Sequence, residues 1–296
     1  MHLPRSPYPL GETLGVLRRM FGPLPAGAPR SRTLLLDPRL APTRWIGFVG
    51  DIMPLMWREA RVSPRVSDFF ADCDHVVGNL EGIVSDEAWF PFLQKHTPAI
   101  FPYLARVAPA GRWVLGVANN HAPDYGDRGF TGTLAAIDAA GMQHVGSAAR
   151  PRVDLGGGVT VTAWTEWTNG HTSCVPTRDP GPPAPSGLHV AFPHWGYEFE
   201  RAPREGQRRA LPAGYSAVVG HHSHVPQDPE VVDGRLVAWS LGNFFSEVRL
   251  PTMGQGALLK IGIAAGEHGA PVVVTASSQP IALHRGDRRY CAIDLL

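Results

Sequence analysis

Short apolar runs alternate with stretches of helical character through the first half of the chain. The runs have the length of buried strands and cover residues 45–50, 75–78, 113–117 and 143–146. Helices are expected between them, from Ser63-Pro64 through Phe70, at 100–109 and at 127–140. Serine followed by proline is typical of a helix start, and a glycine such as Gly141 of a helix end. This alternation predicts a parallel sheet covered by helices.

The second half of the chain is less regular. Further apolar runs indicate strands at 159–163, 188–192, 217–219, 257–263 and 271–276, and a short helix is expected at 204–210. Asp233-Gly234 stands between two more apolar runs and predicts a hairpin with a two-residue turn. The predicted fold class is therefore α/β, with one mixed sheet or two layered sheets.

Polar side chains of the metal-binding and catalytic types follow most of the expected strands. They are Asp51, Asn79, Glu81, Asn120, His121, His194, and the run His221-His222-Ser223-His224. Imidazole, carboxylate and amide groups are common ligands of metal ions in proteins. Because the carboxyl ends of parallel strands meet at one edge of a sheet, we expect these groups to converge. The pattern predicts a hydrolytic metal site.

Each motif taken alone also has an ordinary structural explanation. Asp51 could cap a helix, and the asparagines could sit in turns. A lone histidine such as His194 is more often a polar residue satisfied by the backbone. Glu198, four residues further on, could orient that histidine. The histidine run at 221–224 is the motif least readily explained by structure alone.

Composition narrows the classes of function and partner. With 296 residues and 44% apolar composition, the chain can bury a substantial core. A net charge of +1 gives no electrostatic reason to expect nucleic acid or a membrane as partner. Three scattered cysteines are too few for a disulfide framework and favour a reducing compartment. No apolar stretch approaches the roughly 20 residues of a spanning helix, so we expect a soluble, cytoplasmic protein. The oligomeric state is not readable from the sequence.

The first 44 residues differ in character from the rest. They hold seven arginines against Glu12 and Asp37, and prolines interrupt them. Such a segment is more often a solvated basic arm or helical lead-in than a targeting or binding element. We therefore expect residues 1–44 to form this lead-in and residues 45–296 to form the functional domain.

The motifs together resemble those of a known family. They are GDIM at Asp51, GNLEG at Glu81, ANNHAPDYGDRG around His121, HWGYEF at His194, GHHSHV at His224 and SLGNF at Asn243. In this order they resemble the CapA-type poly-γ-glutamate capsule-synthesis proteins, within the calcineurin-like metallophosphoesterase superfamily. The resemblance covers about residues 45 to 247. It implies a metallophosphoesterase-like four-layer α/β/β/α sandwich with mixed sheets.

The resemblance also implies a centre that holds one or two divalent metal ions. Asp51 and His224 would bind the first ion; Asn120, His194 and His222 would bind the second; Glu81, in preference to Asn79, would bridge them. His121 would act as an outer acid or stabilise the transition state. Met53 stands where the wider superfamily has a histidine, which leaves the first ion one ligand short. His221 could supply that ligand.

Metal chemistry then suggests a reaction. A bound Mn, Fe or Zn ion lowers the pKa of a water from about 15.7 toward 7, so that the water can attack a phosphoester or a γ-glutamyl-type amide. An amide nitrogen must be protonated to leave, which would fall to His121 or Glu198. The substrate would be a small molecule or an anionic oligomer. The alternative is a non-catalytic accessory or binding protein in capsule polymer synthesis.

Overall fold

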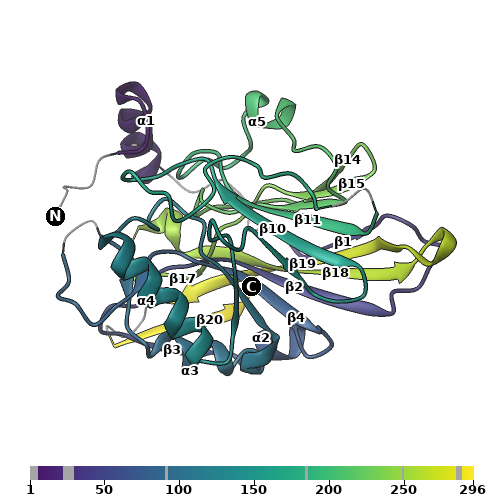
Figure 1. The fold of residues 1–296 in the computed structure, drawn as a ribbon, viewed down its shortest axis with the longest axis horizontal. Helices are drawn as coiled ribbons and strands as arrows, with labels where there is room; N and C mark the ends of the chain where they lie inside the picture. The colour runs from purple at the N-terminus through teal and green to yellow at the C-terminus, as the bar shows by residue number, and fades with distance from the viewer. Residues whose placement is uncertain (1–5, 23–29, 91–92, 184–185, 249, 285–288) are drawn as a thin grey trace.

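Two β-sheets pack together at the centre of the molecule (Figure 1). The structure is a computed structural model and describes residues 6–22, 30–90, 93–183, 186–248, 250–284 and 289–296. Helices α2 (Pro64–Phe69), α3 (Ile100–Ala105) and α4 (Gly126–Ala139) lie on the side of the larger sheet, and the short α5 (Glu205–Arg209) lies on the opposite side. The predicted α/β fold with two layered mixed sheets, of the metallophosphoesterase-like kind, is confirmed.

The larger sheet has a parallel half and a mostly antiparallel half. The parallel half runs in the order β2 (Arg44–Ile52), β4 (His75–Leu80), β7 (Trp113–Gly116) and β8 (Gln143–Val145). The other half continues from β2 through β18 (Gln255–Ala265), β19 (Pro271–His284), β20 (Tyr290–Leu295) and β3 (Glu59–Val62), while β1 (Arg32–Leu35) pairs with β19 and β17 (Asn243–Phe245) with β2. The parallel strands end at one edge, as the apolar runs predicted.

The smaller sheet has a parallel centre with antiparallel edges. Its order is β14 (Glu230–Val232), β15 (Arg235–Ala238), β12 (Ala217–Val219), β11 (Leu188–His194), β10 (Val159–Thr165) and β9 (Arg152–Asp154). Two further ribbons join β5 (Ile83–Val84) to β6 (Lys95–His96) and β13 (Pro226–Gln227) to β16 (Ser240–Leu241). Strands β11 and β12 end beside the parallel strands of the larger sheet, which places polar residues from both sheets together.

Local signals in the sequence predicted several element boundaries. Pro64 is the first residue of α2, as the Ser63-Pro64 pair indicated. Gly141, just after α4, has a φ of 71°, the left-handed conformation that a glycine supplies most readily. The Asp233-Gly234 turn joins the antiparallel strands β14 and β15, with φ of 49° and 74°. Each of these boundaries follows from the backbone preferences of the residues that stand at it.

The space between the two sheets is the main hydrophobic core. Phe48 of β2 and Phe192 of β11 meet there with ring centroids 6.1 Å apart. Gly116 of β7 faces the same ring, since a Cβ at this position would lie 2.9 Å from the edge of Phe192. A glycine at this point lets the aromatic ring of the opposite sheet approach the backbone, which keeps the two sheets close.

The first 44 residues are only partly the solvated arm that their charge suggested. Helix α1 (Leu10–Met20) supplies the expected helical lead-in, but Tyr8 and Val16 are buried against the rest of the protein. They share an apolar cluster with Met53, Phe199 and Met253. Tyr8 and Val16 are therefore packed against the domain and not solvated, while Leu10, Leu14 and Leu17 are exposed. Residues 1–5 and 23–29 lie outside the described ranges, and the division at residue 44 stays a prediction.

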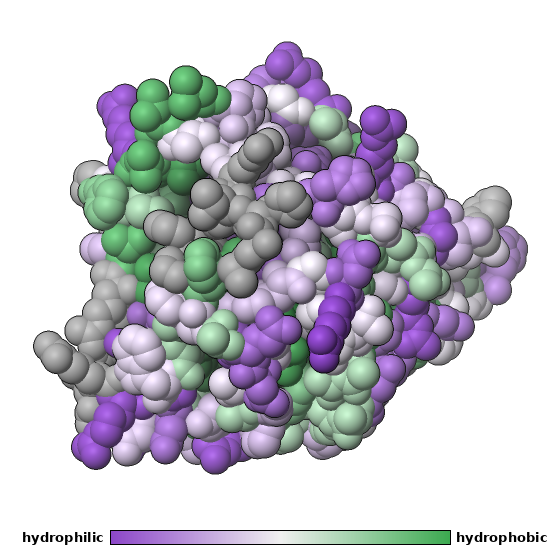
Figure 2. Space-filling model, turned by 60° about the vertical axis from the view of Figure 1, so that its left-hand side comes forward, coloured by the Kyte–Doolittle hydropathy of each residue, from purple (hydrophilic) through white to green (hydrophobic). Residues whose placement is uncertain are grey.

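The other face of α1 is apolar and exposed. Leu10, Leu14, Leu17 and Phe21 recur at helical spacing on it. Figure 2 shows apolar residues gathered at the upper left of this side of the molecule, where α1 lies. Among the helices of the described ranges, none is long and apolar enough to cross a bilayer.

A close approach of two backbones at Gly50 gives a test of this arrangement. A Cβ at Gly50 would lie 2.0 Å from the carbonyl oxygen of Gly242, the same oxygen that accepts from Asp51 N–H at 2.8 Å. We expect Gly50→Ala to lower the free energy of unfolding by about 1–3 kcal/mol or more, because β2 and β17 must separate. Urea unfolding of the purified variant measures this.

The matched control for Gly50→Ala is Gly132→Ala on the exposed face of α4. A Cβ there has no neighbour within 4 Å, and φ is helical. We expect this variant to gain about 0.5–1 kcal/mol, the usual advantage of alanine within a helix. Equal stabilities for the two variants would contradict the close approach at Gly50.

Candidate metal centre

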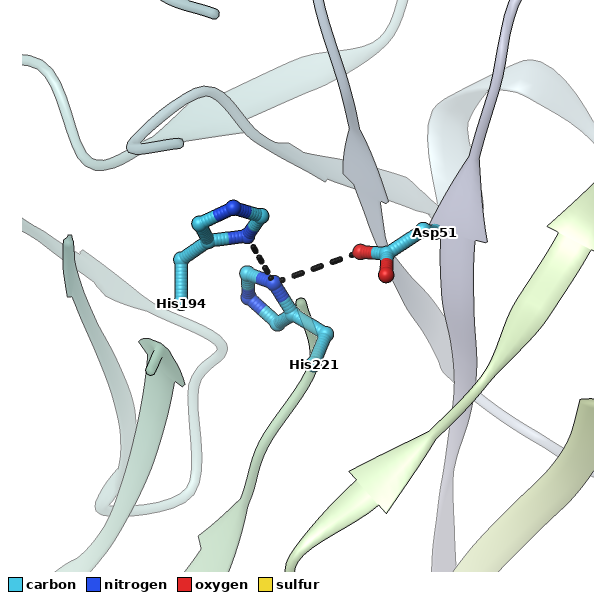
Figure 3. A group of neighbouring side chains, drawn as sticks. All are labelled: Asp51, His194 and His221. Atoms are coloured by element: carbon cyan, nitrogen blue, oxygen red, sulfur yellow. Dashed lines mark hydrogen bonds and ion pairs between the residues drawn. The ribbon is translucent and has the colours of Figure 1, made fainter. Parts of the chain in front are cut away.

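The strand ends bring six of the predicted ligands into one buried cluster. Their ligand atoms form three overlapping groups, within each of which all atoms lie within 4.8 Å of one another. The groups are Asp51 with His194 and His221, Glu81 with His194 and His222, and Asp51 with Glu81 and His224. Figure 3 shows the first group, with the imidazole of His221 between His194 and Asp51. Every member is 3% exposed or less.

Asp51 is the most heavily bonded member. Its Oδ1 accepts from the amide of Asn79 at 2.8 Å, and its Oδ2 accepts from the backbone N–H of His222 at 3.0 Å. His221 and His224 approach the same carboxylate at 3.4 and 3.2 Å. Burial alone would raise the pKa of Asp51, but these two histidines hold it well below its usual value. Asp51 is therefore ionised, as a metal ligand must be.

Glu81 has the opposite surroundings. It is fully buried, and neither carboxylate oxygen has a hydrogen-bond partner among the described residues. The nearest cationic group is Nε2 of His224, 3.7 Å from Oε1. Burial raises the pKa of Glu81 well above its usual value, and the charge of Asp51 raises it further. Leaving two such oxygens unpaired in the interior is costly, so this carboxylate fits a bound cation.

Asn79 holds Asp51 in place, which leaves Glu81 as the better candidate for a bridging ligand. The amide nitrogen of Asn79 donates to Asp51, and its oxygen accepts from Asn119 at 3.2 Å. Asn119 also accepts from the backbone N–H of His121 at 3.2 Å. Both ends of the Asn79 side chain are thus used, in contrast to the two free oxygens of Glu81. The preference for Glu81 over Asn79 has a geometric basis, and its role as a bridge stays a prediction.

Two of the histidines are neutral, which is the form that binds metal ions. Burial and the neighbouring histidines lower the pKa of both His194 and His222 well below its usual value. Nε2 of His194 donates to Oδ1 of Asn120 at 2.9 Å, and its Nδ1 pairs with Nδ1 of His221 at 2.7 Å. The predicted second-ion ligands Asn120, His194 and His222 therefore come from three separate strand ends to one place.

His224 is charged in the absence of an ion. Burial lowers its pKa, but the carboxylates of Glu81 and Asp51 outweigh burial and raise it to about 10. Nδ1 of His224 donates to Oδ1 of Asn243 at 3.0 Å, and the amide of Asn243 donates to the backbone of Met253. Asn243 therefore fixes the orientation of the ring, as partners of metal-binding histidines commonly do. The sequence contained Asn243 in a motif but gave it no role.

His121 belongs to a separate hydrogen-bonded group at the side of the cluster. Its Nδ1 lies 2.8 Å from Oδ2 of Asp124, and the amide nitrogen of Asn169 lies 3.1 Å from the same ring nitrogen. Asn169 also accepts from the amide of Asn120 at 3.4 Å. Asp124 and Asn169 were not identified from the sequence: Asp124 stands within the motif around His121 but was given no role, and Asn169 comes from a separate loop. They tie the position of His121 to that of Asn120.

The hydrogen-bond partners of the His194 ring include Asn120 and His221, while the backbone oxygen of Glu198 accepts from Arg19. A role for Glu198 in orienting His194 stays a prediction. Glu198 is half-buried, and burial raises the pKa of its carboxyl above the usual value. An acid role for Glu198 stays a prediction.

A residue outside the predicted set also enters the cluster. Tyr8 is buried, and its hydroxyl lies 2.5 Å from Nε2 of His222. Burial, together with the charges of Glu198 and Glu81, raises the pKa of this phenol well above its usual value. Without an ion the hydroxyl is therefore protonated. Nothing in the local sequence around Tyr8 marks it as part of a site, since 214 residues separate the two partners.

The donor set suits a divalent transition metal. Carboxylates, an amide oxygen and neutral imidazoles are ligands of Mn, Fe and Zn, and the free oxygens of Glu81 lack any other partner among the described residues. Met53 is buried in the apolar cluster beside Tyr8 and offers no imidazole. His221, by contrast, lies within reach of Asp51, so the sequence-based suggestion that it completes a first-ion site is geometrically possible.

The part of the chain that forms the cluster is similar to known proteins. The family model described as "Bacterial capsule synthesis protein PGA_cap" matches residues 45–169 and 184–248, which include every predicted site residue. The PGA biosynthesis protein CapA of Bacillus subtilis is 29% identical over 235 residues, covering 67% of this chain and 62% of that protein.

Two further relatives match the chain in the same way. The capsule biosynthesis protein CapA of Bacillus anthracis is 29% identical over 242 residues, which cover 67% of this chain and 58% of that protein. A probable polyglutamine synthesis accessory protein of Mycobacterium tuberculosis is 26% identical over 206 residues, which cover 56% and 53%. The matches thus span less than two thirds of each relative's own length.

A histidine beside the cluster gives a pH-dependent test. His96 is buried, its Nε2 pairs with the backbone oxygen of Glu81 at 2.9 Å, and burial lowers its pKa from 6.5 to about 4. Between these values the unfolded chain binds the proton and the folded protein does not. Stability is therefore lost as the pH falls from about 6.5 to about 4, by roughly 3 kcal/mol from this residue.

We expect His96→Gln to remove most of this acid-dependent loss. The measurement is urea unfolding of chelator-treated protein at several pH values between 7 and 4. The exposed His171, changed to Gln, is the matched control and should keep the dependence of the wild type. An unchanged pH dependence in His96→Gln would show that this ring is not buried as described.

Proposed function

Because the chain belongs to the PGA_cap family of bacterial capsule synthesis proteins, we propose that it is a metal-dependent hydrolase acting on a phosphoester or γ-glutamyl-type amide. The relatives named for PGA and capsule biosynthesis support a role in making or processing such a polymer. The observation that carries the hydrolase proposal is Glu81, a buried carboxyl group with no hydrogen-bond partner for either oxygen among the described residues, beside the neutral imidazoles of His194 and His222. A bound cation would satisfy these oxygens.

Different residues of the chain would bind the ions and transfer protons. Asp51, Glu81, Asn120, His194, His222 and His224 would hold the ions, with His221 in reserve. A bound divalent ion would lower the pKa of a water and offset charge on the attacked group. Asp124 holds Nδ1 of His121, so the Nε2 face of that ring is the one that can exchange a proton with a leaving group. An amide nitrogen needs this proton more than a phosphoester oxygen does.

An accessory role without turnover is the second candidate function. One relative is described as a probable accessory protein of polyglutamine synthesis, which supports this alternative. The same cluster would then recognise an anionic polymer through an ion, with no chemistry at His121. The two functions differ in one measurable respect, because only the hydrolase depends on His121 once the metal is bound.

The first test measures the metal content of the protein and of a variant without two of the proposed ligands. We expect purified protein to contain Mn, Fe or Zn, and the double variant His222→Ala with His224→Ala to lose it, by elemental analysis. His171→Ala is the control for histidine loss and should keep the metal. Full metal content in the double variant would contradict the ligand assignment.

The second half of that test separates enzyme from accessory protein. Metal-loaded protein is assayed on aryl phosphomonoesters, phosphodiesters and γ-glutamyl amides, so that each reaction class has its own substrate. We expect His121→Gln to lose activity by about 100-fold or more while its metal content is unchanged, because a general acid contributes on this scale. Absence of turnover on all three classes, with the metal in place, would favour the accessory function.

We also propose that the partner is an anionic oligomer, because a basic cavity lies beside the centre. The cavity has a volume of about 560 Å³ between α1 and residues 199–204. Its charged lining consists of Arg18, Arg19, Arg201, Arg204 and Glu200. Phe199, also in the lining, packs against His224 of the cluster with ring centroids 5.9 Å apart. Arg19 and Arg204 are paired with Glu12 and Glu200, so Arg18 and Arg201 are the groups that would hold an oligomer, with one end near the metal centre.

This proposal predicts a charge-dependent affinity. Arg18 and Arg201 are exposed, so their reversal to Glu should weaken binding of a short poly-γ-glutamate by roughly tenfold, and the loss should shrink at high salt. Isothermal titration calorimetry with the oligomer measures the affinity. Arg178→Glu makes the same charge change on an exposed loop away from the cavity and is the control. An equal loss in the control would indicate only a general charge effect.

A further inference from the structure

Tyr8 joins the N-terminal segment to the metal centre. It is 7% exposed, and its hydroxyl lies 2.5 Å from Nε2 of His222. The residues of α1 and its approach, 6–22, fall outside the ranges 45–169 and 184–248 that match the family model. A group from outside the matched part of the chain therefore contacts one of the histidines placed in the centre.

Several contacts hold this segment in place. The guanidinium of Arg204 donates to both carboxylate oxygens of Glu12 at 2.8 Å. Nε of Arg19 donates to the backbone oxygen of Glu198 at 3.0 Å, and the hydroxyl of Thr252 donates to the backbone oxygen of Met20 at 3.2 Å. These contacts reach two separate parts of the domain, the loop at 198–204 and the turn at Thr252. They fix the segment at both ends of α1, so the position of Tyr8 does not depend on its own side chain alone.

The ring of Tyr8 is confined by aromatic neighbours. Its centroid lies 4.7 Å from that of Trp167, in an edge-on arrangement, and 5.6 Å from that of Tyr197. Met53 and Phe199 belong to the same apolar cluster. With the ring fixed on its apolar sides, the hydroxyl is directed at His222. Burial of the apolar ring and the polar contact of its hydroxyl favour the same placement.

His222 has a strained backbone and a ring with one unpartnered nitrogen among the described residues. Its φ is 103°, a region that residues other than glycine rarely adopt and that persists only where the surroundings determine it. Its backbone N–H is held by Asp51. The Nε2 atom of its ring contacts the hydroxyl of Tyr8. The other ring nitrogen, Nδ1, is buried and has no hydrogen-bond partner among the described residues. Nδ1 is therefore the nitrogen that is free to bind an ion.

We propose that Tyr8 is a positioning residue of the metal centre, whose hydroxyl holds the ring of His222 so that Nδ1 is presented to the ion. With Nδ1 bound to an ion, the ring proton of His222 would reside on Nε2 and would be donated to the hydroxyl oxygen of Tyr8. Metal-binding histidines are generally oriented by a partner at the second nitrogen, most often a carboxylate or carbonyl. Here a tyrosine from the N-terminal segment has that position. The inference rests on the proposed metal-binding function.

The experiment compares ion affinity in Tyr8→Phe and in the wild type. Chelator-stripped protein is titrated with Zn²⁺ in competition with a chromogenic chelator. We expect Tyr8→Phe to bind the ion about 10–100-fold more weakly, the usual effect of removing a partner of a metal-binding histidine. Tyr197→Phe removes a hydroxyl from the same aromatic cluster and should retain the wild-type affinity. Glu12→Gln, which loosens the tether to Arg204, should weaken binding in the same direction and by less.

A spectroscopic readout distinguishes orientation of the ring from a loss of folding. The visible absorption of bound Co²⁺ reports the geometry of its ligands, so it should change in Tyr8→Phe and not in Tyr197→Phe. The unfolding of both metal-free variants is measured alongside. Failure of the wild type to bind any ion would overturn the proposed function itself. Wild-type affinity and spectrum in Tyr8→Phe, or tighter ion binding as expected if Tyr8 merely blocks the site, would overturn this inference alone.

Discussion

Two carboxylates buried side by side impose the constraint on which the rest of the structure depends. Asp51 and Glu81 are both fully buried, and burial of anions is costly unless cations or donors surround them. Asp51 has an amide, a backbone N–H and two imidazoles around it. Glu81 has only His224, at 3.7 Å, among the described residues. The asymmetry holds the pKa of Asp51 low and raises that of Glu81, and a bound divalent ion would offset the cost of ionising the second carboxylate.

The backbone around Asp51 is shaped to keep this carboxylate in place. The lack of a side chain at Gly50 lets the carbonyl of Gly242 approach closely enough to accept from Asp51 N–H. In the same pairing Asn243 lies in register with Asp51, and Asn243 holds the ring of His224. One close contact between β2 and β17 thus places a carboxylate and the orientation of a histidine together. A side chain at position 50 would therefore disturb both the carboxylate of Asp51 and the ring of His224.

The parts of this structure that follow from local residue types could be predicted from the sequence. Pro64 starts α2, Gly141 follows α4, and Asp233-Gly234 closes a hairpin, each through its own backbone preference. The cluster of ligands was predictable in outline, because strand-end residues of parallel strands share an edge.

Contacts between distant segments could not be predicted in this way. The pairing of β1 with β19, the contact of Asn169 with His121, and the contact of Tyr8 with His222 each join residues with no common local pattern. The partners of His194 could not be inferred from spacing, since Asn120 and His221 reach it from other strand ends. The N-terminal charge was misleading because net charge describes a segment's average, whereas Tyr8 and Val16 are buried individually.

The N-terminal segment links the two proposed sites mechanically. Helix α1 supplies Arg18 and Arg19 to the basic cavity, while Tyr8, just before it, contacts the metal centre. Arg204 lines the cavity and also anchors Glu12 of α1. An anion that drew Arg204 away from Glu12 would therefore loosen the segment that holds Tyr8 against His222. Contacts from Arg19 to Glu198 and from Thr252 to Met20 also hold the segment, so the Glu12–Arg204 pair is one of several contacts through which an anion in the cavity would affect the metal centre. By linkage, such an effect of the anion on ion affinity would have an equal effect in reverse.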